Sequence, residues 1–266
     1  MKPFLKWAGN KYQIIERVLE KLPVGNRLIE PFVGSGAVFL NTHYPNYLLA
    51  DANQDLISLY QFLQSEGEKF IQDGRQFFIP ENNQSEAFYS LRALFNSTPD
   101  RRLKALLFVY LNKHCFNGLC RYNAKGEFNT PFGRYKKPYF PEKEMQFFHQ
   151  QAKCAVFECG DFLATLQKAV PGDVIYCDPP YVPLSKTANF TSYSIGGFSQ
   201  DQQIRLAKTA SQLAAKGITV IISNHDTEFT RSAYQQAAIS YFEVQRFISC
   251  DGTRRQKAAE MLASFN

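Results

Sequence analysis

The sequence predicts an α/β protein with a mainly parallel sheet and helices on both of its faces. Short apolar runs alternate with helical patterns at both ends of the chain, which is the order of repeated strand–helix–strand units. In between, the pattern changes to helices and then to a basic stretch that contains several glycines. We therefore expect a sheet domain from residues 1–60 and 151–266, with a mainly helical domain of residues 61–150 inserted in it.

The amino-terminal part predicts two strand–turn–helix units. The apolar run within residues 26–30 indicates a short buried strand, followed by a glycine turn and an apolar helix start at residues 37–40. Residues 47–50 indicate a second strand that ends at Asp51, and residues 55–60 indicate the helix after it.

The carboxyl-terminal part continues the alternation. Residues 155–157 and 173–177 are apolar runs of strand length, and a helix is expected near residues 200–216. Residues 218–222 are rich in β-branched side chains and indicate another strand. The chain shows no internal repeat and no low-complexity linker.

Composition limits the classes of function. The chain has 266 residues, of which 45% are hydrophobic, and no apolar run approaches the ~18 residues that a membrane span needs. The amino terminus lacks a secretory core, and the six cysteines form no Cys-x-x-Cys pair, so we expect reduced thiols in a cytoplasmic protein. The four histidines are too dispersed for a metal cluster, so no metal site is expected.

Positive charge is concentrated in one stretch. Residues 101–143 contain ten Lys or Arg and only Glu127 and Glu142 as acids, so they exceed the formal net charge of +6 of the whole chain. Residues 116–140 interleave this charge with aromatic side chains and glycines, without helical or strand periodicity. Such a stretch predicts an ordered loop whose arginines and exposed rings bind nucleic acid, with a solvated basic face as the alternative.

The most specific chemical signal is Asp178-Pro179-Pro180-Tyr181, directly after an expected strand. Proline fixes φ and has no N–H, so this tip is a rigid cup of acceptors, namely the Asp178 carboxylate and a proline carbonyl, with the Tyr181 ring as a wall. The cup suits a flat heterocycle with an exocyclic amine, because the acceptors hold the amine hydrogens while the rings stack. A Pro-Pro turn without function is the alternative.

A nucleotide site is predicted at the first strand–turn–helix unit. The glycines of Gly34-Ser35-Gly36 let the backbone approach a ligand, although Phe39 replaces the third glycine of a dinucleotide fingerprint. Asp51 ends the next strand, where a carboxylate accepts hydrogen bonds from ribose hydroxyls. Asp161-Phe162 offers an acceptor and a ring to an adenine. Helix capping is the alternative for both aspartates.

Several motifs, in this order, resemble those of Dam-type DNA adenine methyltransferases. They are Phe-Leu-Lys-Trp-Ala-Gly-Asn-Lys at 4–11, Glu-Pro-Phe-Val-Gly-Ser-Gly at 30–36, the segments 117–123 and 130–135, the cup at 178–181, and the segments 189–193, 223–226 and 252–254. The likeness spans nearly the whole chain.

Two positions depart from the family pattern. Asn10 stands where glycine is usual, and because Asn tolerates positive φ we expect the turn to be kept. His114-Cys115-Phe116 replaces a more tyrosine-rich segment, which leaves the expected duplex wedge aromatic but without a phenolic hydroxyl.

The resemblance implies a Rossmann-like methyltransferase sheet and an inserted DNA target-recognition domain, mainly helical, with a basic hairpin or loop. It implies S-adenosylmethionine as methyl donor, S-adenosylhomocysteine as product, and the N6 amine of adenine in duplex 5′-GATC-3′ as acceptor. Because a base amine is buried in the stack, the adenine must be flipped out of the duplex before transfer. Direct in-line transfer requires neither metal nor covalent intermediate, so Cys177 is assigned to packing.

The resemblance also implies roles for single residues. Arg121 is expected to contact a guanine in the major groove, and Phe116 and Asn117 are expected at the gap left by the flipped base. For Trp7 and Lys11, a core anchor and a surface helix residue are the alternatives. The expected catalytic residues are Asp178, Pro179, Pro180 and Tyr181; the cofactor contacts are Trp7, Lys11, Phe32, Gly34, Gly36, Asp51, Asp161, Phe162 and Asp178; the DNA contacts are Arg92, Phe116, Asn117, Leu119, Arg121, Asn123, Pro131, Arg134, Lys136, Ser185 and Arg254, with Lys137 and Lys257 as further candidates.

Other functions stay open at this point. One alternative is an amino-methyltransferase acting on cytosine, RNA or a protein amide, and another is a catalytically inactive DNA-binding relative. A nucleotide-dependent oxidoreductase is disfavoured by the incomplete glycine fingerprint. The resemblance favours a housekeeping role linked to DNA replication and mismatch repair in the bacterial cytoplasm and nucleoid, with double-stranded DNA as partner and with no membrane, metal or obligate protein partner.

Overall fold

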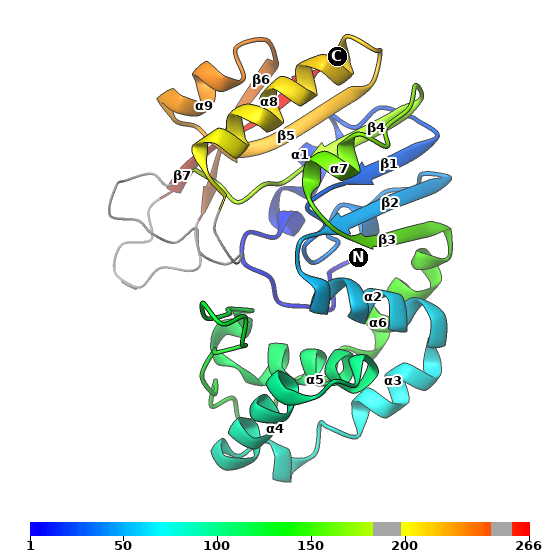
Figure 1. The fold of residues 1–266 in the computed structure, drawn as a ribbon, viewed down its shortest axis with the longest axis vertical. Helices are drawn as coiled ribbons and strands as arrows, with labels where there is room; N and C mark the ends of the chain where they lie inside the picture. The colour runs from blue at the N-terminus through cyan, green and yellow to red at the C-terminus, as the bar shows by residue number, and fades with distance from the viewer. Residues whose placement is uncertain (183–197, 246–256) are drawn as a thin grey trace.

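Seven strands form one sheet of order β3-β2-β1-β4-β5-β7-β6 in the part of the chain that the computed structural model describes, residues 1–182, 198–245 and 257–266 (Figure 1). The strands are β1 (Arg27–Glu30), β2 (Asn46–Asp51), β3 (Ala155–Cys159), β4 (Asp173–Cys177), β5 (Thr219–His225), β6 (Ala238–Gln245) and β7 (Lys257–Phe265).

Strands β1 to β5 are parallel to one another, as the sequence predicts. The register places Ile29 opposite Ile175 between β1 and β4, and Cys177 opposite Ile222 between β4 and β5. These central strands are buried on both faces, which explains why they are continuous apolar runs without alternation. The antiparallel pair β6–β7, which joins the sheet through β5, was not expected.

Helices cover both faces of the sheet, as predicted. On one face Ile29, Ile175 and Ile222 pack with α7 (Phe162–Leu166) and α8 (Gln200–Ala214), next to α9 (Glu228–Ala233). On the other face a second cluster joins Leu28 and Tyr176 with residues of α1 (Ile15–Leu19), α2 (Gln54–Glu66) and α6 (Glu142–Gln151).

The helix expected at residues 37–40 is only a short 3₁₀ helix, η2 (Phe39–Asn41). The Thr42 hydroxyl donates to the Val38 carbonyl at 3.0 Å, and the Asn41 amide donates to the Ala37 carbonyl at 2.8 Å. These side chains take the carbonyls that a longer helix would use, and β2 begins four residues later.

A helical lobe lies between β2 and β3 in the sequence and below the sheet in Figure 1. Its core is continuous with one face of the sheet, since Phe4, Tyr60, Phe108 and Phe148 belong to one buried cluster. Helix α2 runs unbroken through residue 60. The remaining elements of this region are α3 (Glu68–Arg75), η3 (Pro80–Asn82), α4 (Ser85–Ser97), α5 (Arg101–His114), η4 (Phe116–Gly118) and η5 (Ala152–Cys154), and η1 (Lys11–Ile14) precedes α1.

Residues 115–134 form a hairpin after α5, which we call the basic hairpin. Backbone bridges pair Cys115 with Phe132 and Tyr122 with Phe128. The expectation of exposed rings was partly wrong: Phe128 is only 1% exposed and anchors the hairpin in the core, whereas Phe116 is 51% exposed. A buried and an exposed aromatic residue look the same in the local sequence, because only tertiary packing decides which ring is buried.

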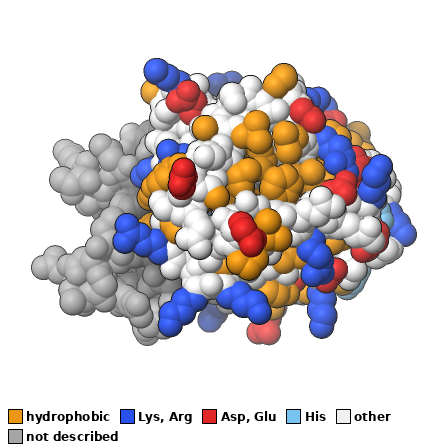
Figure 2. All heavy atoms as spheres, turned by 90° about the horizontal axis from the view of Figure 1, so that it is seen from below, with side chains coloured by type: hydrophobic (Ala, Val, Ile, Leu, Met, Phe, Trp, Pro, Cys, Tyr) orange, Lys and Arg blue, Asp and Glu red, His pale blue; other side chains and the backbone are white. Residues whose placement is uncertain are grey.

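Seen from below in Figure 2, hydrophobic side chains gather at the centre of the helical lobe, and Lys and Arg side chains stand around its rim. The exposed large hydrophobic side chains of α4 and the segment before it are Ile79, Tyr89 and Leu94. None of the described helices combines the length and the apolar character that crossing a bilayer requires.

Candidate functional site

The carboxyl ends of β1, β2, β4 and β5 meet at one edge of the sheet, where ligands of open α/β folds bind. Glu30 ends β1, Asp51 ends β2, Asp178 follows β4 and Ser223 lies near the end of β5. The amino-terminal segment reaches the same edge through Lys11. The fold therefore gathers residues that are up to about two hundred positions apart in the sequence.

Asp178 is held by two donors. The Lys11 ammonium lies 2.8 Å from Oδ1, and the Ser223 hydroxyl donates to the same oxygen at 2.9 Å. Burial raises the pKa of Asp178, while Lys11 and Ser223 oppose this shift by stabilising the carboxylate. Lys11 is only 6% exposed and its ammonium lies 4.5 Å above the centre of the Tyr181 ring. The alternative of a surface helix lysine was therefore wrong.

The two prolines and Tyr181 are fixed from outside the cup. The Pro180 carbonyl accepts a hydrogen bond from the Gln203 amide at 2.8 Å, and the Tyr181 hydroxyl donates to Glu260 at 3.2 Å. The His225 ring meets the Tyr181 ring edge-on at 4.6 Å. Among the described residues, no hydrogen bond reaches the Pro179 carbonyl. Neighbouring elements therefore hold Pro180 and Tyr181 in place.

Supporting residues at the end of β5 received no individual role from the sequence. Asn224 accepts a hydrogen bond from the Val182 N–H at 3.3 Å and donates to Gln203 at 3.1 Å, and His225 Nδ1 donates to the Val182 carbonyl at 2.8 Å. These bonds fix the chain directly after Tyr181. The sequence did contain a signal for these residues, because three polar residues end a strand whose other side chains are β-branched.

Glu30 is a second missed residue. Its side chain is 2% exposed, and Oε1 has no hydrogen-bond partner among the described residues. Burial raises the pKa of Glu30 well above its usual value, and the nearby Asp178 raises it further. An unpaired buried carboxyl oxygen is costly, so a site of this kind favours a ligand that brings a donor. The sequence signal was an acid at the end of the first strand.

The glycine turn lies between Trp7 and Asp51. Gly34 has φ +48°, and a Cβ there would lie 2.8 Å from Trp7 Nε1. The Gly34 N–H donates to Asp51 at 3.1 Å, and the Asn53 N–H donates to the other Asp51 oxygen at 2.9 Å. Burial raises the pKa of Asp51, and these N–H donors oppose the shift. Asn53 caps α2, so the capping alternative for Asp51 was wrong.

The Asp161 side chain accepts a hydrogen bond from the Leu163 N–H at 2.9 Å and so caps α7, as its alternative stated. The Phe162 ring, 5% exposed, stacks on Phe32 with centroids 5.4 Å apart. Phe198 meets Phe32 edge-on at 5.5 Å. The structure thus brings Phe32 and Phe162 together in one aromatic wall beside the ends of β1 and β3.

The turn around Asn10 forms, but by a different route from the one expected. Gly9 has the positive φ of +74°, whereas Asn10 has φ −58°. The Asn10 side chain accepts a hydrogen bond from the Tyr12 N–H at 3.1 Å and caps η1. The expectation that Asn10 itself takes positive φ was therefore wrong.

The basic hairpin presents most of the predicted DNA contacts on its surface. Arg121 is exposed, and its Nε donates to Asn129 Oδ1 at 2.8 Å. Asn117 and Arg134 both have φ +53°, which turns the chain at the two ends of the hairpin. Leu119 is partly exposed, and exposed positions also include Phe116, Pro131, Lys136 and Lys137.

Like Arg121, the predicted DNA contacts Arg92 and Asn123 are hydrogen-bonded within the protein. Arg92 Nη1 donates to the Thr130 carbonyl at 3.0 Å. Asn123 Oδ1 accepts the N–H groups of Lys125 and Glu127 at 2.9 and 3.0 Å. Both side chains shape the hairpin in this structure. Ser185 and Arg254 lie outside the described residues, and Lys257 begins β7.

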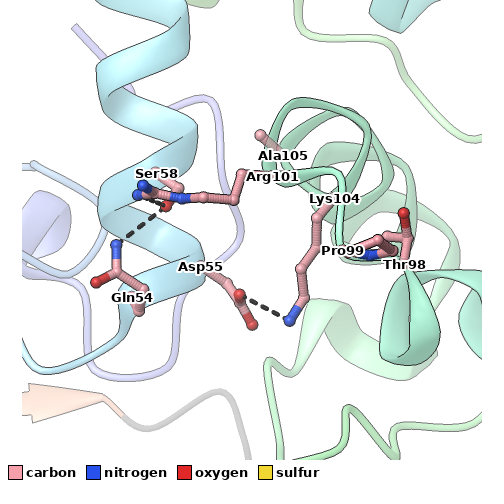
Figure 3. A pocket seen from close by; sticks show the side chains of 8 residues that line it. All are labelled: Gln54, Asp55, Ser58, Thr98, Pro99, Arg101, Lys104 and Ala105. Atoms are coloured by element: carbon pink, nitrogen blue, oxygen red, sulfur yellow. Dashed lines mark hydrogen bonds and ion pairs between the residues drawn. The ribbon is translucent and has the colours of Figure 1, made fainter.

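Part of the basic excess turns inward at the start of α5. A hollow of about 220 Å³ lies between α2 and α5. At this hollow Lys104 lies 3.0 Å from Asp55, and Arg101 donates to Ser58 at 3.0 Å; Figure 3 shows these side chains. Arg102 pairs with Glu66 and Asp73 at 2.5 and 2.6 Å. These three basic residues of the stretch 101–143 therefore join helices instead of adding to a basic surface.

The sequence is similar to known proteins over nearly its whole length. Residues 7–248 match the family model described as D12 class N6 adenine-specific DNA methyltransferase. The chain is 51% identical over 265 residues to a DNA adenine methylase of Serratia marcescens, covering 99% of this chain and 98% of that protein. Identity is 49% to a DNA adenine methylase of Vibrio cholerae and 48% to one of Escherichia coli K12, covering 96% and 95% of those proteins and 99% of this chain.

Proposed function

The chain belongs to the D12 class of N6 adenine-specific DNA methyltransferases, and from this premise we propose that it methylates an adenine flipped out of duplex 5′-GATC-3′ with S-adenosylmethionine as donor. The family methylates adenine at N6, which sets aside the cytosine, RNA and protein-amide alternatives. The observation that carries the proposal is the rigid cup at Asp178, held by Lys11 and Ser223 beside the glycine turn.

The residues around the glycine turn fit S-adenosylmethionine, which supplies a methyl group on a sulfonium when bound. Glu30 offers an unpaired buried oxygen that suits the ammonium of the donor's methionine part. Asp51 at the end of β2 would accept hydrogen bonds from the ribose hydroxyls, and the Gly34 backbone would approach the donor without a side chain in between. The remaining contacts proposed for the donor are Lys11, Phe32, Gly36, Asp161, Phe162 and Asp178.

The cup orients the acceptor amine. Asp178 Oδ1 is engaged by Lys11 and Ser223, so Oδ2 and the Pro179 carbonyl are the acceptors proposed for the two amine hydrogens. Accepting both hydrogens directs the nitrogen lone pair away from the ring plane, and the bonds strengthen as positive charge develops on nitrogen. Tyr181 supplies a stacking surface, and fixed alignment contributes to the rate of an in-line transfer.

The basic hairpin is proposed to recognise the duplex as part of an inserted recognition domain, residues 61–150. Arg121 is exposed at the hairpin surface and suits a bidentate contact with guanine, while Leu119, Pro131 and Arg134 lie near the other bases. Phe116 and Asn117 enter or support the gap left by the adenine. Lys136 and Lys137 suit contacts with the DNA phosphates. The proposed place of action is the bacterial cytoplasm and nucleoid. In the family context, solitary housekeeping use is proposed.

Replacement of Asp178 tests the chemistry. We expect Asp178→Ala to lower the methylation rate by at least about 10²–10³-fold, because the charge developing on the amine loses its acceptor. The assay measures transfer of tritium from labelled S-adenosylmethionine to a GATC duplex, a one-base variant and a pre-methylated duplex. Asp201→Asn, at an exposed position in the first turn of α8, is the control.

The unfolding midpoint and the duplex affinity of Asp178→Ala show whether the variant is folded. A folded variant with near-normal turnover would show that Asp178 does not hold the acceptor amine. Equal methylation of the GATC duplex and its one-base variant by the wild-type chain would show that GATC is not the recognition sequence.

A further inference from the structure

Asn112, near the end of α5, clamps two segments that are distant in sequence. Its side chain is fully buried, with 0% exposed. Oδ1 accepts a hydrogen bond from the Lys6 N–H at 2.9 Å, and Nδ2 donates to the Lys6 carbonyl at 2.7 Å. The same Nδ2 donates to the Gly118 carbonyl at 3.1 Å and lies 3.4 Å from Cys120 Sγ. One buried amide therefore holds both the amino-terminal segment and the basic hairpin.

The first of these segments belongs to the donor side of the site. Lys6 directly precedes Trp7, whose indole contacts Gly34 of the glycine turn. Lys11, five residues further on, holds Asp178. A shift of the Lys6 backbone thus moves the groups that border the proposed donor site and the carboxylate of the cup.

The second segment carries the proposed base contacts. Gly118 lies between Asn117 and Leu119, and Arg121 follows three residues later. Gly118 has φ +66°, and a Cβ at this position would lie 2.4 Å from the Lys6 Cβ. The two segments are therefore in direct contact as well as bound to the same amide, and no side chain fits between them.

We infer that Asn112 is a positioning residue that couples cofactor binding to recognition of the DNA bases; this inference rests on the proposed function. The Asn112 amide is fully buried and both of its polar atoms are paired, so movement of one segment alone leaves a buried polar atom without one of its partners. Each ligand therefore favours the arrangement that the other requires. Coupling of this kind is reciprocal and typically changes an affinity by about 5–150-fold.

A second connection joins the hairpin to the sheet domain but does not involve the amino-terminal segment. The Tyr122 hydroxyl donates to Asp55 at 2.8 Å, and Lys104 lies 3.0 Å from the other Asp55 oxygen. This route leads to α2 and has no contact with Lys6. If cofactor binding and DNA recognition stay coupled after Asn112 is replaced, the coupling runs through a connection such as Tyr122–Asp55.

Asn96 of α4 provides a matched control. Its amide donates to the Phe128 carbonyl at 3.1 Å and its oxygen accepts from the Phe128 N–H at 2.8 Å. Asn96 therefore holds the same hairpin with the same two-way amide clamp, but has no bond to Lys6. Its replacement loosens the hairpin without breaking the connection to the donor side.

The test measures the affinity for S-adenosylhomocysteine with and without a saturating GATC duplex, so that no turnover is needed. Trp7 is the single tryptophan of the chain, so its emission reports binding at the donor site. We expect the GATC duplex to raise the affinity of the wild type for S-adenosylhomocysteine by about 5–150-fold, and a one-base variant duplex to raise it less. In Asn112→Ala and Asn112→Asp the ratio of the affinities with and without duplex should be close to one. In Asn96→Ala this ratio should stay as in the wild type.

The inference is overturned if the duplex does not raise the affinity of the wild type for S-adenosylhomocysteine. It is also overturned if a folded Asn112 variant keeps this gain in affinity, or if Asn96→Ala loses as much of it as the Asn112 variants do. Asn112→Asp is isosteric and keeps the acceptor for the Lys6 N–H, while its second oxygen faces the Lys6 and Gly118 carbonyls instead of donating to them. A measurement on the wild type serves even if both variants fail to fold. S-adenosylhomocysteine should slow amide hydrogen exchange within residues 116–121, and unchanged exchange there would overturn the inference. Because none of these readouts uses methylation, they are separate from failure of the proposed function.

Discussion

At the scale of the residue, burial decides what a titratable side chain contributes. Lys11 and Lys104 are both lysines near an aspartate, but Lys11 is almost fully buried and fixes the carboxylate of the cup. Burial raises the pKa of Cys177, so its thiol stays protonated in the ordinary pH range. This agrees with the packing role that the sequence analysis assigns to it.

His114 gives a testable pH effect, because burial lowers its pKa to about 4. Its ring stacks on Tyr110 at 4.0 Å, and Nδ1 donates to the Tyr110 carbonyl at 2.9 Å. The unfolded chain binds a proton at the ordinary histidine pKa of about 6.5, so between pH 6.5 and 4 it holds more protons than the folded chain. This contribution to stability is present above pH 6.5 and is lost as the pH falls toward 4.

We expect His114→Phe to remove this dependence while keeping the ring in place. The free energy of unfolding of the wild type should fall, relative to the variant, by about 2 kcal/mol between pH 7 and pH 5. Urea unfolding at the two pH values measures the difference. Parallel behaviour of the two proteins would show that His114 titrates normally in the folded chain.

At the scale of the element, the strand–turn–helix after β1 depends on one glycine. Gly34 combines positive φ with close contact to Trp7, and its N–H and carbonyl bind Asp51 and Tyr60 at 3.1 and 2.5 Å. An L side chain at this position is strained and has no room. The turn is therefore constrained by its neighbours on the β2 side and on the amino-terminal side.

We expect Gly34→Ala to weaken S-adenosylmethionine binding at least about tenfold, since strain of about 1–3 kcal/mol must be relieved by moving Trp7. The measurements are a binding titration and the Trp7 emission maximum, which should shift in the free variant. Gly217→Ala is the control, because Gly217 also has positive φ, +76°, but has open space around it. Normal affinity in Gly34→Ala would place the donor away from the turn.

At the scale of the whole molecule, the helical lobe shares a core with the sheet, and ion pairs join helices within the lobe. Arg102 of α5 pairs with Glu66 of α2 and Asp73 of α3, with each of these side chains about two thirds or more buried. The hydrogen bonds of Glu66 and Asp73 raise the pKa of Arg102. We interpret these pairs as part of what holds α2, α3 and α5 together within the lobe.

Arg102→Met should lower the free energy of unfolding by about 1–3 kcal/mol, because two carboxylates lose a charged hydrogen-bond donor. Urea unfolding followed by Trp7 emission and by far-ultraviolet circular dichroism measures this loss, and the two probes should still coincide. Arg75→Met is the control, since Arg75 pairs with Glu142 at a more exposed site and should cost less. If Arg102→Met and Arg75→Met lose the same free energy of unfolding, Arg102 stabilises the protein no more than an exposed ion pair does.

Much of the fold and part of the site could be predicted from the sequence alone. The strand at 173–177 was predicted with its observed bounds, and the cup at 178–181 follows from the chemistry of proline, which acts within a few residues. The β6–β7 pair was missed, and so were Glu30 and the clamp formed by Asn112, because their partners lie far away in the chain.

The sequence by itself determined which residue types stand at the ends of the strands, where the rigid turn lies, and to which family the chain is similar. Only the tertiary structure decided which rings and charges face the site. Phe128 and Arg102 look like Phe116 and Arg121 in a basic, aromatic stretch, but the first two are used to hold the protein together. Local propensity acts over a few residues, whereas burial and pairing depend on chain segments brought together by the whole fold.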